Sequence, residues 1–351
     1  MKILLTLDYE LFNGKKCGTV QNCLLRPMKE LLKVLDKYGL KATLFVDTVF
    51  VNRLGELGQH YPELQDEYNK ILEQLRSLYE QGHDLQLHIH PNWLHASYNE
   101  GQWQSILTDY KLSDMLDEEV DRMFKEGKEL LGSITGDPQK IIAYRAGAYC
   151  IQTYSKFVDV FEKYGIRIDS SVFRHQKSIT EKWQHYDYTH IPVDYSYAFS
   201  KDVCLKDDKG SFLEISIPTY HISKFTMLCY KFGIRGKEIK KWGDGLGSIN
   251  MLSGKSHRFF NIIKGRLMPS IEVASIDSSK GWLLDHIFKK EKREGNDYML
   301  IMGHPKNFTP YSLECLSAFL QKLSKDEHQF VTILNFGHCC PLKVVDDYYK
   351  V

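Results

Sequence analysis

The feature that most constrains this chain is a repeated alternation of short apolar runs with helical patterns. Runs of the length of a buried strand occur at 3–7, 41–47, 84–90, 140–145 and 166–171, and later at 212–217, 298–302 and 330–334. Helical periodicity fills intervals at 24–38, 62–81, 114–131 and 154–164. This rhythm favours a parallel sheet or barrel, in which ligand sites form at the carboxyl ends of the strands.

Two histidines close one of the expected strands. His88 and His90 lie two residues apart, directly before Pro91, so both side chains face the same side if the strand persists. Imidazole is the commonest side-chain ligand for zinc and similar ions. The pair therefore favours a metal site, although in a chain with 14 histidines it also fits polar residues with no ligand role.

Polar side chains recur where successive expected strands end. Because the carboxyl ends of parallel strands meet at one edge, we expect these residues to gather in one site. The recurrence is more specific than any single motif. The residues are Asp8, Glu10, His88, His90, Arg145, Asp169 and His304.

The global composition is that of an ordinary globular protein. With 351 residues and a net charge of +1, the chain fits one large domain or two, and nothing points to a nucleic-acid partner. Its eight cysteines show no C-x-x-C spacing and predict no cysteine metal framework. The apolar run at the N-terminus is too short for a signal peptide, and no stretch is long enough to span a bilayer, which predicts a cytoplasmic protein.

The strand and helix rhythm fails between residues 223 and 269. This segment carries ten lysine or arginine residues against Glu238 and Asp244, and we expect an insertion or long loop there. One interpretation is a basic lid over an anionic substrate, or a surface that faces anionic lipid headgroups. The alternative is a solvated basic face that acidic helices elsewhere balance.

Five motifs, taken in order, resemble those of the polysaccharide deacetylases, the NodB-homology group that forms carbohydrate esterase family 4. They are residues 6–10 (TLDYE), 88–91 (HIHP), 145–149 (RAGAY), 169–171 (DSS) and 303–305 (GHP). The resemblance implies one domain over residues 1–351, folded as a distorted (β/α)7 barrel with 223–269 inserted. It also implies one divalent metal, usually zinc, in an open groove.

In that family the first motif supplies a carboxylate general base and then a carboxylate metal ligand, which correspond here to Asp8 and Glu10. The two acids are usually adjacent, whereas Tyr9 separates them in this chain. The resemblance therefore implies Asp8 as the base and Glu10 as the ligand, and the reverse assignment stays open. Gly147 stands where many members have proline.

The second motif departs most from the family pattern. Members usually have two histidines four residues apart, but the residue four positions after His88 is Asn92, and asparagine is a poor zinc ligand. His90 would face the same way as His88 and is the expected second imidazole, which gives Glu10, His88 and His90 as the metal ligands. His95 is a more distant candidate.

The resemblance assigns roles to four further residues, and Trp93 is a candidate by its place directly after the second motif. Arg145 matches the arginine that orients the catalytic carboxylate, and Tyr149 matches the tyrosine whose backbone N–H helps to stabilise the oxyanion. His304 matches the general acid, and Asp169 the carboxylate that supports it through a hydrogen bond. Trp93 could stack on a sugar ring, or equally serve in barrel packing.

Together these features predict a metal-dependent hydrolase that removes acetyl groups, N-acetyl rather than O-acetyl, from a sugar, an oligosaccharide or a polysaccharide precursor. It would cleave carbon–nitrogen bonds other than peptide bonds. One alternative is an amidohydrolase acting on a small non-sugar amide. Another is a degenerate barrel that binds a glycan or partner without turnover; Asn92 keeps it open, while the joint presence of Asp8, Arg145 and His304 favours an enzyme.

Overall fold

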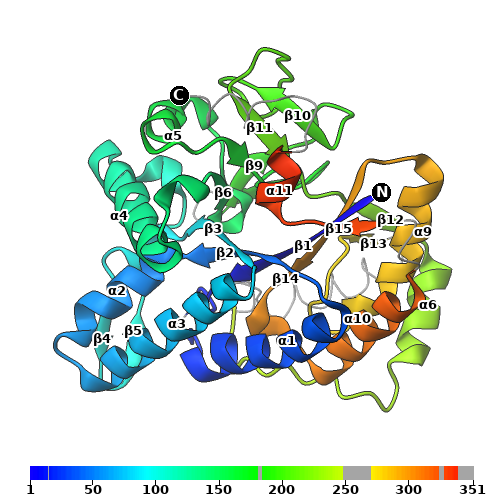
Figure 1. Ribbon diagram of the computed structural model, residues 1–351, viewed down its shortest axis with the longest axis horizontal. Coiled ribbons are helices and arrows are strands. Elements are labelled where there is room, and N and C mark those ends of the chain that lie inside the picture. The colour runs from blue at the N-terminus through cyan, green and yellow to red at the C-terminus, as the bar shows by residue number, and fades with distance from the viewer. Residues whose placement is uncertain (15, 181–183, 248–269, 324–327, 339–351) are drawn as a thin grey trace.

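The molecule is built around a curled sheet (Figure 1), seen in a computed structural model that describes residues 1–14, 16–180, 184–247, 270–323 and 328–338. Seven parallel strands form the path of this sheet, in the spatial order β11, β7, β6, β3, β2, β1, β14. They are β1 (Lys2–Tyr9), β2 (Thr43–Asp47), β3 (Asp84–Ile89), β6 (Ala143–Ala146), β7 (Ile168–Asp169), β11 (Phe212–Ile215) and β14 (Tyr298–Gly303). β10 (Ser196–Phe199) pairs antiparallel with β11, and β15 (Gln329–Phe330) pairs with β1.

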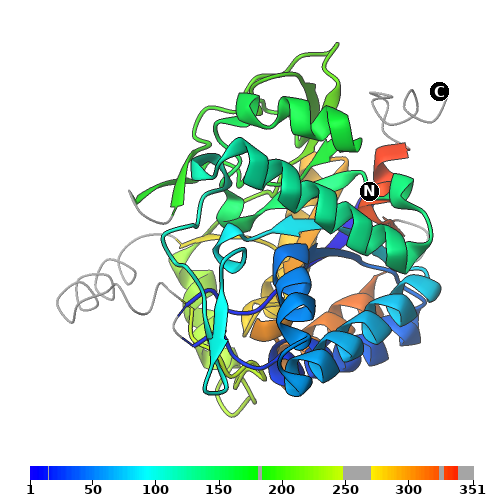
Figure 2. The same cartoon turned by 90° about the vertical axis from the view of Figure 1, so that its left-hand side faces the viewer.

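Helices cover the outer face of the sheet. Figure 2 shows the blue helices α1 to α3 and the teal helix α4 stacked along this face. Pro62 occupies the first turn of α3, as its fixed φ favours, and α1 ends at Gly39 in the left-handed conformation. The helices are α1 (Arg26–Tyr38), α2 (Thr48–Gly58), α3 (Pro62–Glu80), α4 (Asp117–Thr135), α5 (Val158–Tyr164), α6 (Lys224–Gly233), α9 (Leu284–Glu294), α10 (Pro310–Lys322) and α11 (Ile333–His338).

Alternation along the strands separates two cores. On β1, Ile3, Leu5 and Leu7 belong to the outer core beneath the helices. Leu4, on the opposite face, belongs to a smaller core that fills the barrel interior with Phe45, Ile142, Leu213 and Leu300. By the same alternation Thr6 and Asp8 face the interior above Leu4.

The helix α11 lies at the amino ends of the barrel strands. The backbone N–H of Ile333 donates to the Thr43 hydroxyl at 2.8 Å, and that of Leu334 donates to Asp84 Oδ2 at 3.2 Å. Ile333 itself packs into the interior core. The expected strand at 330–334 is therefore wrong beyond Phe330, because a short apolar run fits a buried helix as well as a strand.

The expected fold class is confirmed: the sheet is a distorted (β/α)7 barrel. Among the described residues its two outer parallel strands, β14 and β11, share no ladder. Side-chain contacts cross this gap, since the Tyr298 hydroxyl on β14 lies 2.9 Å from the carbonyl oxygen of Ser216, directly after β11, and 2.8 Å from that of Tyr195.

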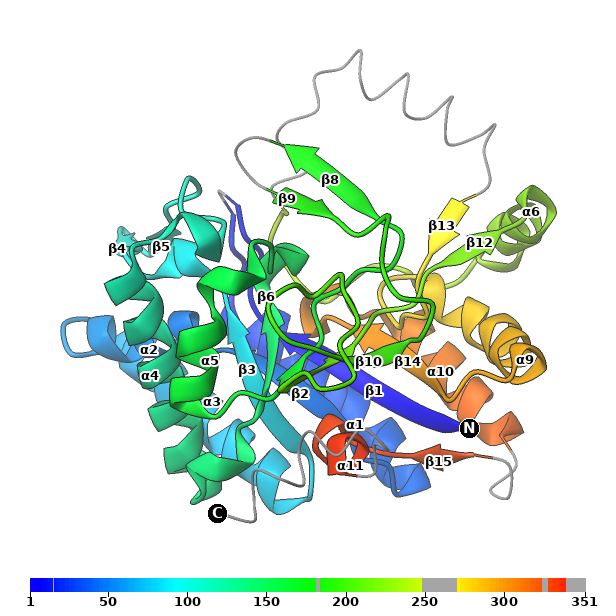
Figure 3. The same cartoon turned by 90° about the horizontal axis from the view of Figure 1, so that it is seen from above.

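Three two-stranded antiparallel sheets surround the end of the barrel toward which the strands run, and α11 lies at the opposite end (Figure 3). They pair β4 (Ser97–Asn99) with β5 (Gln102–Gln104), β8 (Lys177–Thr180) with β9 (Gln184–Asp187), and β12 (Tyr220–Ile222) with β13 (Ser270–Glu272).

The β12–β13 pair brings together the two ends of the segment expected to be an insertion. Residues 223–247 of that segment include α6, and the rest, 248–269, lies outside the described residues. None of the described helices is long and apolar enough to cross a membrane.

Removal of the Tyr298 hydroxyl should weaken the barrel at its gap. We expect Tyr298→Phe to lower the free energy of unfolding by about 1–3 kcal/mol, because the buried Ser216 carbonyl oxygen loses its hydroxyl donor, whereas that of Tyr195 keeps the donors of Ser216. Urea denaturation would measure the change. Tyr68→Phe is the matched control, since the Tyr68 hydroxyl has no hydrogen bond to the described residues; an equal loss in both variants would contradict a role at the gap.

Candidate active site

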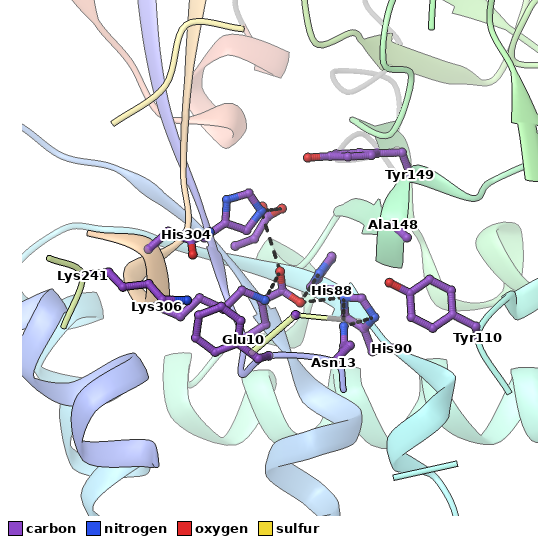
Figure 4. Close-up of a pocket in the computed structure, with 14 residues that line it drawn as sticks. Glu10, Asn13, His88, His90, Tyr110, Ala148, Tyr149, Lys241, His304 and Lys306 are labelled. Atoms are coloured by element: carbon purple, nitrogen blue, oxygen red, sulfur yellow. Dashed lines mark hydrogen bonds and ion pairs between the residues drawn. The ribbon is translucent and has the colours of Figure 1, made fainter. Parts of the chain in front are cut away.

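A pocket of about 370 Å³ opens at the carboxyl ends of the barrel strands (Figure 4). Residues at the ends of β1, β3 and β14 and directly after them supply its polar floor, and the turn after β6 supplies one wall. Its lining includes Asp8, Glu10, His88, His90, Tyr149 and His304, joined by Asn13, Tyr110, Lys241 and Lys306. Six of the nine side chains expected in a site thus meet in one cavity, and Arg145 lies directly behind them.

Arg145 and Asp8 form a buried ion pair at the floor of the pocket. Arg145 Nη1 donates to Asp8 Oδ1 at 2.6 Å, and the guanidinium is completely buried. Burial alone would raise the pKa of Asp8, but the charge of Arg145, with help from His304, outweighs burial and holds that pKa below its usual range. Asp8 is therefore ionised, and its Oδ2 lies 3.4 Å from His304 Nε2.

Glu10 lies between a lysine and the two histidines. Lys306 Nζ is 3.0 Å from Oε1 of Glu10 and also donates to the carbonyl oxygen of Leu11 at 2.7 Å. Oε2 of Glu10 lies 2.7 Å from His90 Nε2 and 3.8 Å from His88 Nε2. Burial opposes the ionisation of Glu10, but the charge of Lys306 and the adjacent His90 lower its pKa well below the usual range.

The orientation of His88 is fixed by its backbone partner. Its Nδ1 lies 2.7 Å from the carbonyl oxygen of Arg145, which can only accept, so Nδ1 carries a proton and Nε2 points to the pocket. Burial alone would lower the pKa of His88, but Glu10 and Asp8 outweigh burial and raise it. The amide of Asn13 packs against His90, with Nδ2 2.9 Å from the ring Nδ1. His88 and His90 thus face the same side of their strand, as expected.

Two buried atoms at the centre of this cluster match the requirements of a metal site. His88 Nε2 and Glu10 Oε2 have no contact of hydrogen-bond geometry with the described residues, which is costly for buried polar atoms. Ligand atoms of Glu10, His88 and His90 all lie within 4.8 Å of one another. One carboxylate and two imidazoles form a donor set suited to zinc. Asp8, Glu10 and His304 form a second such group.

His304 is oriented by Asp277 rather than by Asp169. Its Nδ1 lies 2.6 Å from Asp277 Oδ2, and its backbone N–H donates to Asp277 Oδ1 at 2.7 Å. Burial alone would lower the pKa of His304, but Asp277 and then Asp8 outweigh burial and raise it to about 10. The ring is therefore an imidazolium at neutral pH.

The expected contact between Asp169 and His304 is wrong because alternation turns Asp169 to the other face of the sheet. Its neighbours Ile168 and Ser170 face the barrel interior, where Arg145 bonds Ser170. Asp169 instead accepts from the Ser171 hydroxyl at 2.6 Å and lies beside Glu214. Burial raises the pKa of both carboxyls, that of Asp169 to about 6, and their mutual repulsion adds to the shift of Glu214.

Trp93 does not reach the pocket. Its side chain is completely buried against Phe50 and Trp103, with ring centroids 4.9 and 5.5 Å away. The prediction that Trp93 stacks on a sugar ring is therefore wrong, and the alternative, that Trp93 packs in the core, is the one observed. The aromatic surface of the pocket comes from Phe12, Tyr110 and Tyr149.

The turn that carries Tyr149 has an unusual backbone. Ala148 and Tyr149 both have positive φ angles, 52° and 64°, which are uncommon for residues with a side chain. The Tyr149 ring stacks on Phe173 with centroids 5.0 Å apart, and the Tyr149 carbonyl accepts from the Tyr188 hydroxyl at 2.5 Å. These contacts hold a strained turn at the wall of the pocket.

The other nitrogen ligands weighed from the sequence lie elsewhere. The amide of Asn92 is completely buried behind the pocket, with Nδ2 3.5 Å from Asn13 Oδ1. His95 lies on the surface and pairs with Glu119 at 2.9 Å.

Sequence reasoning missed Asn13, Tyr110, Lys241, Asp277 and Lys306. Asp277 had a usable signal, since it ends the apolar run 273–277 (VASID) in the same way that Asp8 ends its strand. Residue 275 pairs in parallel with Met302 of β14, which explains why Asp277 arrives beside His304. Lys306 follows the GHP motif directly but lacked any pattern that would separate it from a surface lysine.

Comparison with known proteins supports the resemblance found in the sequence. Residues 25–169 match the family model described as "Polysaccharide deacetylase", a region that contains His88, His90, Arg145 and Tyr149. The resemblance to this family is thereby confirmed. No curated protein has a significantly similar sequence.

Solved structures with a similar course of the chain are distant in sequence. A putative polysaccharide deacetylase from Mycobacterium smegmatis is 15% identical, with 93% of this chain and 78% of that chain covered and a TM-score of 0.47. A PuuE allantoinase is 11% identical, with 97% of this chain and 90% of that chain covered and a TM-score of 0.45. A family 4 carbohydrate esterase from Streptomyces lividans, in complex with acetate, is 13% identical, with 94% of this chain and 91% of that chain covered and a TM-score of 0.37.

The absence of a side chain at Gly147 leaves space for the His90 ring. A Cβ atom at residue 147 would lie 2.6 Å from the carbonyl oxygen of Ile89 and 2.8 Å from His90 Nδ1. We expect Gly147→Ala to displace the His90 ring, to lower the free energy of unfolding by about 1–3 kcal/mol and to weaken zinc binding. Denaturation and zinc titration would measure both.

The matched control is Gly233→Ala, where an added Cβ meets nothing within 4 Å. It should leave unfolding and zinc binding unchanged. If Gly147→Ala behaved like this control, the close packing of residue 147 on His90 would be irrelevant to the site.

Proposed function

Because residues 25–169 match the polysaccharide deacetylase family, we propose that this chain is a metal-dependent hydrolase that removes N-acetyl groups from a sugar, an oligosaccharide or a polysaccharide precursor. One observation carries the proposal. A carboxylate held ionised by Arg145 and an imidazolium held by Asp277 face each other across 3.4 Å, beside the cluster of Glu10, His88 and His90. A base, an acid and a metal cluster in one pocket are what amide hydrolysis requires.

Glu10, His88 and His90 are the residues that would hold the metal, which we take to be zinc. The Lys306 ammonium occupies one side of Glu10, so Oε2 is the oxygen turned toward the histidines. A bound divalent ion would polarise the acetyl carbonyl and make a water molecule more acidic. Three protein ligands would leave coordination positions open, as in catalytic zinc sites.

Asp8 is the proposed general base. Its Oδ1 is engaged by Arg145, and its Oδ2 faces the pocket. As the water oxygen bonds to the acetyl carbon, Oδ2 takes one proton from that water. Arg145 keeps the carboxylate ionised and fixes its orientation, so its role is to position the base.

The remaining steps belong to Tyr149 and His304. In the proposed mechanism the Tyr149 backbone N–H donates to the carbonyl oxygen as negative charge develops there. The carbon–nitrogen bond then breaks, and His304 Nε2 gives its proton to the leaving nitrogen, which departs as an amine while the acetyl group leaves as acetate. Asp277 stabilises the charged ring before this transfer and holds its orientation.

The two sides of the pocket differ in chemistry, which bears on how a substrate would lie. Tyr110 and Tyr149 line one side, and Lys241 and Lys306 line the other, where both ammonium groups lie over the Phe12 ring (Figure 4). We assign the sugar ring to the uncharged side, that of the two tyrosines. Lys241 belongs to the segment 223–269, which we assign as an insertion, with a lid role over the pocket, in a single domain spanning residues 1–351.

Metal content and acetate release test the proposal together. We expect the purified protein to hold close to one zinc ion and to release acetate from N-acetylated sugars in a panel that also contains O-acetylated sugars and ureides. His88→Ala and His90→Ala should each weaken zinc binding more than about a hundredfold, because each removes a ligand. Asp8→Asn should retain zinc but release little acetate.

His95→Ala serves as the control for general effects of losing an imidazole, since His95 lies on the surface beside Glu119. It should keep both zinc and activity. A protein that binds no zinc after addition of the metal would contradict the hydrolase and favour a barrel that binds a glycan without turnover. Turnover of ureides alone would replace the sugar substrate with a small amide.

The contact between Asp277 and His304 leads to a separate prediction. Asp277→Asn removes the negative charge that favours the imidazolium, so the pKa of His304 should fall and the alkaline limb of the pH–rate profile should move to lower pH. We expect kcat at neutral pH to fall about a hundredfold. Asp169→Asn, on the outer face of the sheet, should leave the alkaline limb in place; the opposite outcome would restore Asp169 as the partner of the acid.

A further inference from the structure

The helix α6 presents an apolar stripe to solvent. Phe225, Leu228 and Phe232 have exposed fractions of 76, 52 and 55%. At 100° per residue these three positions fall within about 60° of one another around the helix axis. In the part of the chain that the structure describes, these large side chains on a single face are thus left largely uncovered.

The opposite face of α6 is firmly packed. Tyr230 stacks on Trp282, with ring centroids 4.9 Å apart and an interplanar angle of 7°, and Met227 packs against the outer core. The Ser223 hydroxyl caps the helix by accepting from the Thr226 backbone N–H at 3.1 Å. Because the inner face is fully used, the exposed stripe cannot be buried by a rotation of α6.

Exposed apolar side chains are concentrated in α6 and in the sequence that follows it. Ten large hydrophobic side chains are exposed among the described residues, and six of them lie between residues 225 and 271. Figures 1 and 3 both place α6 at the periphery of the molecule. The six are Phe225, Leu228, Phe232, Ile239, Leu246 and Ile271.

Cations border the stripe. Lys224, Arg235 and Lys240 are exposed and have no carboxylate partner in the part of the chain that the structure describes. The Arg235 guanidinium lies 4.6 Å from the centre of the Phe232 ring. Residues 223–247 contain six lysine or arginine residues and only two acidic residues.

We propose that this stripe and its cations dock on a lipid bilayer that carries anionic headgroups. Aromatic and aliphatic side chains flanked by lysine and arginine are the features of an interfacial helix, which inserts its apolar face while its cations meet the headgroups. A second copy of the chain fits less well, because a two-fold contact would bring the same cations face to face.

The docking surface belongs to the same segment as part of the pocket. Lys241 and Gly247 line the pocket, and the backbone N–H of Trp242 donates to the Phe308 carbonyl at 3.0 Å, which anchors the segment to the barrel. This inference does not depend on the reaction that the pocket performs.

Vesicle sedimentation with the full chain tests the proposal. We expect binding to vesicles of equal parts phosphatidylcholine and phosphatidylglycerol, little binding to phosphatidylcholine alone, and weaker binding at high salt. The triple variant Phe225→Ser, Leu228→Ser, Phe232→Ser should lose at least about tenfold in affinity. Charge reversal in Lys224→Glu, Arg235→Glu should cause a similar loss.

The matched control replaces three equally exposed residues elsewhere, as Leu116→Ser, Val193→Ser and Leu205→Ser, and should bind like the unmodified chain. Thermal unfolding would verify that every variant is folded. Absence of binding to the anionic vesicles, or an equal loss in the control, would overturn the proposal. So would a dimer in sedimentation analysis that the stripe variant abolishes without any vesicle binding, because the stripe would then be a contact between copies.

Discussion

The buried guanidinium of Arg145 is the interaction on which the site and the barrel both depend. Its five N–H bonds match five acceptor contacts: two to Thr6, two to Ser170 and one to Asp8. The Phe45 ring lies 4.1 Å from its charged carbon. Loss of either partner from such a pair leaves an uncompensated buried charge, typically at a cost of about 3–5 kcal/mol. The ion pair that orients the base therefore also joins three strands across the interior of the barrel.

The departure from the usual second motif is coupled to a departure at the end of the neighbouring strand, since β3 pairs with β6. His90 stands two residues after His88 instead of four, and its ring occupies the space that a side chain at residue 147 would need. Gly147 replaces the proline of many family members, and Asn92 is withdrawn behind the pocket, where Asn13 contacts its amide. The differences at residues 90, 92 and 147 thus act together: they place the imidazoles of His88 and His90 on the same side as Glu10.

Much of the barrel could be predicted because the strands alternate and end on polar residues, which are local signals. Successive side chains of a strand face opposite sides of the sheet. Since Ser170 faces the interior, the same alternation would have predicted that Asp169 faces outward, away from His304. The role of Trp93 could not be assigned from sequence, because its burial depends on tertiary contacts with Phe50 and Trp103. Lys306 and Tyr110 likewise acquire meaning only when distant segments meet, and no local pattern marks them.

The strand pairing places the first and last barrel strands side by side, with Lys2 opposite Tyr298. Asp8 and His304, the proposed base and acid, come from those two strands and meet across this seam. During synthesis on the ribosome the base emerges first, but its partner follows only after nearly 300 residues, and pairings of such long sequence separation form slowly. Asp8 and His304 therefore meet only in the late event that pairs β1 with β14, so a partly synthesised chain that lacks β14 would also lack the proposed pair of base and acid.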